Sequence, residues 1–149
     1  MARGDYADFE EAALYFGSGV FDLTSDTIKV GLVDDTITPS ADDGTPTWGD
    51  YSANEVSTGG GYVADGLTLS GVTFTEAGGV ATFDDTGNIS LAQDGSGFTD
   101  AYWAIIYDDD AASDQAIGFL DLGGPVSEQA GTVTITWNAG GIATVTVSS

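Results

Sequence analysis

Residues Ala101–Tyr107 read Ala-Tyr-Trp-Ala-Ile-Ile-Tyr, and this stretch decides the fold. It lies between a glycine-rich turn at 95–97 and three aspartates at 108–110, so it has the length of a strand and not of a helix. Side chains in a strand alternate between two faces. Trp103, Ile105 and Tyr107 fall on one face, and Tyr102, Ala104 and Ile106 fall on the other. Because both faces are apolar, the stretch predicts a central strand that is buried on both sides.

The other strands are predicted from short apolar or alternating runs that turn residues separate. They are expected at 27–33, 67–69, 72–75, 80–84, 89–92, 117–122, 132–137 and 143–147. Gly78-Gly79 is typical of a hairpin turn, and the last two strands are also expected to form a hairpin around 138–141. Strands that follow one another without intervening helices favour an all-β fold. The expected architecture is an antiparallel two-sheet β-sandwich, of the jelly-roll or immunoglobulin-like kind.

One short N-terminal helix is predicted over Asp5–Phe16. Phe9 and Phe16 recur at the spacing of one helix face, and Tyr6 widens this apolar stripe. The stripe must be covered, either by the protein's own sandwich or by a partner. The chain is therefore expected to have an N-terminal helical segment over 1–19 and a single sandwich domain over 20–149.

Charge excludes several classes of function. The 149 residues include 24 acidic side chains but only two basic ones, Arg3 and Lys29, so the formal net charge is −22. Such a surface repels phosphate, which argues against nucleic acids and anionic membranes as partners. No apolar run approaches the roughly 18 residues of a membrane span, and no signal-peptide pattern is present, so synthesis as a soluble cytoplasmic chain is expected.

The sequence offers little for catalysis. It contains no histidine and no cysteine, and Lys29 falls inside a predicted strand. Paired carboxylates can hydrolyse glycosides, but the acids here cluster in turns, where solvent keeps their pKa values ordinary. We therefore expect a non-enzymatic protein without a cofactor.

Three further patterns suggest ligands but have simpler explanations. Acidic turns at 34–35, 84–88 and 108–110 offer oxygen ligands for calcium, although their spacing does not match a calcium loop and solvated turns are expected instead. Arg3-Gly4-Asp5 spells an integrin-type tripeptide, a match so short that chance accounts for it.

The third pattern is a set of aromatic residues near the long polar loop 34–57. Trp48, Tyr51 and Tyr62 could form a platform for stacking sugars, but aromatics beside glycine turns more often pin loops to the protein body.

Several segments, taken in order, carry a family resemblance. They are Phe21-Asp22-Leu23-Thr24-Ser25-Asp26-Thr27-Ile28-Lys29-Val30, Gly60-Gly61-Tyr62, Leu69-Ser70-Gly71-Val72-Thr73, Ala81-Thr82-Phe83-Asp84, Ile106-Tyr107-Asp108 and Thr136-Trp137-Asn138-Ala139-Gly140-Gly141-Ile142. Together they resemble a family of small virion proteins of tailed bacteriophages, commonly described as capsid decoration or cement proteins. The resemblance spans nearly the whole chain, and its motifs are structural rather than catalytic.

The resemblance implies a structural protein on the outer surface of a phage capsid, synthesised in the host cytoplasm. It implies binding to the phage major capsid protein, assembly as a homotrimer, and stabilisation of contacts between capsid subunits. Tyr6, Phe9 and Phe16 are the candidate contacts with the capsid or with sister subunits. The alternative is a host- or glycan-binding module of a phage tail or head fibre, with the sugar near Trp48 and Tyr51.

Overall fold

The chain folds into antiparallel strands with two short α-helices, as its alternating runs predict. The computed structural model describes residues 1–147, so the last two residues of the predicted domain 20–149 lie outside the described part. The strands are β1 (Tyr6–Asp8), β2 (Ile28–Val33), β3 (Leu67–Thr68), β4 (Val72–Ala77), β5 (Val80–Asp85), β6 (Ile89–Leu91), β7 (Ala101–Asp108), β8 (Ala116–Val126), β9 (Val133–Ile135) and β10 (Ala143–Thr146). The helices are α1 (Ala12–Ser18), α2 (Trp48–Tyr51) and the 3-10 helix η1 (Ser52–Asn54). Over residues 1–147, no helix has the length and apolar character that crossing a membrane requires.

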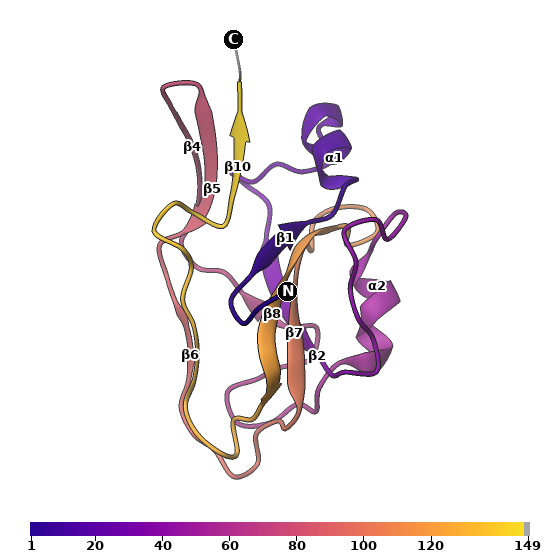
Figure 1. The fold of residues 1–149 in the computed structure, drawn as a ribbon, viewed down its shortest axis with the longest axis vertical. Helices are drawn as coiled ribbons and strands as arrows, with labels where there is room; N and C mark the ends of the chain where they lie inside the picture. The colour runs from indigo at the N-terminus through magenta and orange to yellow at the C-terminus, as the bar shows by residue number, and fades with distance from the viewer. Residues whose placement is uncertain (148–149) are drawn as a thin grey trace.

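Five strands form the main sheet in the order β1-β8-β7-β2-β3, with β7 at its centre (Figure 1). Each neighbouring pair is antiparallel, and Ile105 of β7 lies opposite Gly31 of β2. Ile105 and Tyr107 belong to one buried cluster, whereas Ala104 and Ile106 belong to the cluster on the other face. The prediction of a central strand buried on both sides is therefore confirmed.

Two smaller sheets complete the larger of these clusters. One has three strands in the order β10-β5-β4, and the other pairs β6 with β9. Val30 and Ile106 of the main sheet share a core with Phe83 of the three-stranded sheet and with Leu91 and Ile135 of the two-stranded sheet. In Figure 1 the three-stranded sheet lies at the top of the view beside α1, and β6 runs along the left side.

The smaller cluster is completed by α2 and by the residue after β1. Trp48 of α2 stacks on Tyr107, with ring centroids 5.1 Å apart and planes 2° apart. A Cβ atom on Gly31 would collide with the indole of Trp48, so the glycine within β2 allows α2 to approach the sheet. Phe9 packs in the same cluster. The long polar loop thus contains a short helix that is fixed against the main sheet.

The predicted N-terminal helix is wrong over its first half. Tyr6–Asp8 is extended and pairs with β8, with Tyr6 opposite Leu120. The helix spans only Ala12–Ser18, and it ends at Gly19, whose positive φ of 74° suits glycine. Residues 6–8 form a strand on the edge of β8 instead of a helix, because the N–H and C=O groups along that edge need hydrogen-bond partners. Residues 1–19 are therefore not a separate helical segment, since β1 belongs to the main sheet.

The predicted hairpin of the last two strands is also wrong. β9 pairs with β6, and β10 pairs with β5. The turn lies where the sequence predicts it, with Gly141 at a φ of 95°, but it carries the chain from one small sheet to the other. The Gly78-Gly79 hairpin between β4 and β5 is confirmed, since both glycines have positive φ, as a tight two-residue turn requires.

Candidate binding surface

An apolar groove separates helix α1 from the three-stranded sheet. It consists of two adjoining hollows of about 410 and 640 Å³. Both hollows are lined by Ala13 and Phe16 of α1, Phe74 of β4 and Val145 of β10. We call this feature, defined by these four residues, the α1–β10 groove. Figure 1 shows β10 as the strand of its sheet nearest to α1.

Aromatic packing fixes the floor of the α1–β10 groove. Phe16 stacks on Phe74 with ring centroids 6.3 Å apart and planes 8° apart, and it meets Phe21 edge to face at 5.3 Å. Ala12, on the inner side of α1, is buried in the larger core. These contacts seat the helix, so the walls of the groove have a defined position before anything binds.

The wall formed by β10 becomes more exposed towards its C-terminal end. Ala143, Val145 and Val147 alternate onto one face of the strand. Ala143 packs on the core, Val145 is 47% exposed and Val147 is 78% exposed. The apolar face of β10 thus runs from the core towards solvent.

The outer edge of β10 has unpaired backbone groups. Within residues 1–147, β10 pairs only with β5. Val147 donates its N–H to the carbonyl of Gly79, in register with the rest of the ladder. Since backbone groups point to alternate sides of a strand, Thr144 and Thr146 direct theirs away from β5. This free edge borders the hollow that Asp8 and Glu10 also line.

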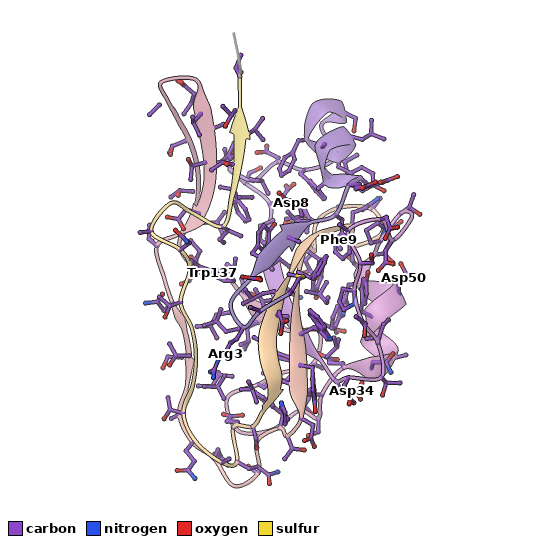
Figure 2. All side chains as sticks on the ribbon, in the orientation of Figure 1. Arg3, Asp8, Phe9, Asp34, Asp50 and Trp137 are labelled. Atoms are coloured by element: carbon purple, nitrogen blue, oxygen red, sulfur yellow. The ribbon has the colours of Figure 1, made fainter. Side chains whose placement is uncertain are left out.

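The α1–β10 groove is bordered by negative charge. Asp8 and Glu10 line one hollow and Asp22 lines the other, and neither lining contains a basic residue. Lys29 pairs with Asp109 at 2.9 Å, and Arg3 lies at the opposite end of β1 from α1 (Figure 2). Partial burial raises the pKa of Asp8, although the Tyr6 hydroxyl donates to it at 2.6 Å and opposes the shift. Burial thus disfavours the charge on Asp8, as expected of a carboxylate without a cationic partner.

The three predicted contact residues occupy different environments. Phe16 lies in the α1–β10 groove. Tyr6 lies on edge strand β1, beside a hollow that Trp137 also lines. Phe9 also borders one hollow of the groove, but it is only 1% exposed and packs on Phe119 with ring centroids 5.1 Å apart, so its ring belongs mainly to the protein's own core. Figure 2 shows Asp8 and Phe9 where β1 leads into α1. The groove residues Phe74 and Val145 escaped prediction because nothing local to them signals that α1 lies opposite.

The aromatics near the long loop do not form an exposed platform. The side chains of Trp48, Tyr51 and Tyr62 are all buried. Tyr51 donates its hydroxyl to Asp43 at 2.8 Å. Tyr62 donates to Glu55 at 2.8 Å and accepts from the N–H of Leu32 at 2.9 Å. The interpretation that these rings pin loops is confirmed, and the predicted sugar-stacking surface is wrong.

Aspartates of the acidic turns accept hydrogen bonds from nearby backbone groups. Asp108 accepts from the N–H groups of Asp110 and Ala111, and Asp85 accepts from Gly71 at 2.8 Å. Within residues 1–147, no three acidic side chains are placed so that they could hold a metal ion. Burial and then the nearby Asp26 raise the pKa of Asp108 to about 7. Because Asp108 is fully buried, this perturbed carboxyl cannot reach a substrate.

Two further features are structural. Glu128 is fully buried and accepts the N–H of Gly61 at 2.7 Å, so one carboxylate joins two loops that are far apart in the sequence. No local pattern in the sequence points to that residue. Arg3-Gly4-Asp5 forms a turn held against β8, with the N–H of Gly4 donating to the carbonyl of Asp121 at 2.8 Å.

Comparisons with known proteins do not identify the chain. No family model matches it, and neither does any curated protein or solved structure. Function must therefore be inferred from the groove, the charge and the fold, and the phage resemblance remains a prediction.

Proposed function

We propose that the protein is a non-enzymatic virion structural protein that decorates the outside of a tailed-phage capsid. In this role it binds the major capsid protein and stabilises contacts between its subunits. The observation that carries the proposal is the α1–β10 groove, a pre-formed apolar surface on a strongly acidic β domain. The resemblance of the ordered segments to decoration proteins supports the same role.

Net charge supports a position on the outer surface of the shell. A formal charge of −22 keeps neighbouring particles apart in solution. A protein that lined packaged DNA would need basic residues to compensate the phosphates, and this chain has only two. Synthesis in the host cytoplasm and release by lysis suit a chain without cysteine.

The physical mechanism is linkage. A decoration protein that binds the assembled shell but not separated subunits stabilises the shell by mass action. We expect the main sheet to pack against the two smaller sheets as a two-layer sandwich, which would supply the rigid unit. A homotrimer would place three grooves around one axis. Many modest interfaces then add to a large total stabilisation.

Binding to decoration-free heads tests the proposal. Ala13→Lys places a long charged side chain in the α1–β10 groove, and Leu14→Lys makes the same change on the next residue, which is 64% exposed and outside the groove lining. Lysine is a good helix former, so both variants should fold. We expect wild type and Leu14→Lys to co-sediment with heads, and Ala13→Lys to lose binding. Heads that bind neither wild type nor Leu14→Lys would refute the proposal.

The number of copies per particle is a second test. Decoration requires hundreds of copies, which quantitative mass spectrometry of purified virions measures directly. A few copies per virion would contradict decoration and would favour a fibre module. Burial of Trp48 and Tyr51 disfavours the glycan site that the alternative places at these two residues.

A further inference from the structure

We propose that the α1–β10 groove binds an extended, basic segment of a partner protein, which adds as a fourth strand to the free edge of β10. The partner's lysine or arginine side chains would face the acids that border the groove. The identity of the partner protein rests on the proposed function. The chemistry of the bound segment follows from the groove itself.

The free edge determines the backbone conformation of the segment. Among the described residues 1–147, no strand pairs with the outward N–H and C=O groups of Thr144 and Thr146, which lie at the spacing of a strand. An added strand satisfies both residues at once, whereas a helix in the same place leaves their groups unpaired. The edge is short, which limits the segment to a few paired residues.

The groove walls determine which side chains suit the segment. Successive side chains of a strand alternate, so every second one would point towards α1 and the floor. There it would meet Ala13, Phe16 and Val145, which are all apolar. The segment should therefore carry small or branched apolar residues at alternate positions.

Charge selects a basic partner over a second copy of this chain. Asp8 and Glu10 line the same hollow as Thr144 and Thr146, and Asp22 lines the adjoining hollow. A second copy would add a further net charge of −22, and its Lys29 is already paired with Asp109. Lysine or arginine on the partner would instead compensate acids that have no cation nearby.

A designed peptide tests this inference on the full-length protein. The probe is Lys-Thr-Val-Thr-Val-Thr-Lys, whose two lysines lie at the ends of the strand face that carries the valines, and its matched counterpart replaces each lysine by glutamate. We expect saturable binding of the basic peptide, with amide shifts at Ala13, Thr144 and Thr146 in NMR spectra and slower hydrogen exchange at both threonine amides. The glutamate peptide should bind at least about tenfold more weakly.

Paired variants separate the backbone contribution from the charge contribution. Thr146→Pro removes an outward N–H without touching the ladder to β5, and Thr146→Ala keeps that N–H. We expect only the proline variant to lose binding. Asp8→Asn with Glu10→Gln should weaken binding about tenfold. Asp35→Asn with Asp100→Asn, which removes the same charge from exposed sites outside the groove lining, should leave it unchanged.

Three results would overturn the inference. They are equal affinity for the two peptides, full binding by Thr146→Pro, and self-association of the protein that protects the Thr146 amide. Failure of the proposed function gives a different pattern, in which the peptide binds as described but phage heads do not. Binding to heads that survives Thr146→Pro would instead retain the proposed function and refute the added strand.

Discussion

The main sheet and the three-stranded sheet use similar apolar strands but cover them differently. Strand β7 has neighbours on both edges and buried clusters on both faces. Strand β10 has one neighbour within residues 1–147, and its apolar face runs from the core into solvent. Buried apolar surface is thus concentrated around β7, whereas the apolar face of β10 stays partly exposed within residues 1–147.

The largest effect is expected from Ile105→Asp in β7. Ile105 is fully buried, and an unpaired buried carboxylate costs several kcal/mol, against a net stability of about 5–15 kcal/mol for a whole domain. We expect the variant not to fold, as judged by circular dichroism and thermal melting. Val63→Asp, at a residue that is 56% exposed, is the control and should melt as wild type does. A soluble, cooperatively melting Ile105→Asp protein would contradict the central role of β7.

The stability of the protein should depend on pH through Asp108, at the C-terminal end of β7. The pKa of Asp108 is raised to about 7, so the folded state holds a proton that the unfolded state releases near pH 4. This contribution is fully present below pH 4 and is lost as the pH rises to 7, at up to about 1.4 kcal/mol per pH unit. Urea unfolding measures the free energy of unfolding at pH 5 and at pH 8. From pH 5 to pH 8 this free energy should fall by on the order of 2 kcal/mol more for wild type than for Asp108→Asn. Equal pH dependence of the two proteins would show that Asp108 is ionised in the fold.

An intermediate effect is expected where α2 meets the main sheet. Gly31→Ala places a methyl group against the indole of Trp48, and overpacking of this kind costs about 1–3 kcal/mol. The comparison variant is Gly44→Ala, whose added methyl group meets no atom within 4 Å and should change stability little. Urea titration measures both variants. Equal stability of the two would mean that α2 is not held against β2.

The smallest effect is expected on β10. Val145→Thr keeps the shape of a half-exposed side chain, so the free energy of unfolding should change by less than about 0.5 kcal/mol. The same substitution at Val30, which is fully buried, adds a hydroxyl to the core and should cost about 1–3 kcal/mol. Equal losses in the free energy of unfolding for the two substitutions would show that β10 is buried as deeply as the main sheet.

Much of the strand pattern could be predicted from sequence, because it depends on local alternation and on turn residues. The run at 101–107 and the turn at Gly78-Gly79 are where the sequence places them. The partners of β9 and β10 could not be predicted, because pairing depends on contacts between residues far apart in the chain. The helix at the N-terminus failed for the same reason, since β8 supplies the partner of Tyr6–Asp8.

The candidate surface was less accessible to prediction than the fold. Phe16 was identified because an apolar helix face needs cover, and it does line the groove. Phe9 shares that spacing but follows the alternation of β1 instead, and its ring is buried. Val145 reads as an ordinary inward residue, because alternation identifies the apolar face of a strand but not whether the chain itself covers it.

The pairing of β1 with β8 has a consequence for biosynthesis. Strand β1 leaves the ribosome well before its partner β8, since Tyr6 lies opposite Leu120. The main sheet is therefore expected to form only after β8 has emerged, on the millisecond-to-second scale typical of non-local β topologies. The β4–β5 hairpin also emerges long before β10, and during that interval its open edge can accept the C-terminal strand of a neighbouring nascent chain, which would produce exchanged dimers at high expression.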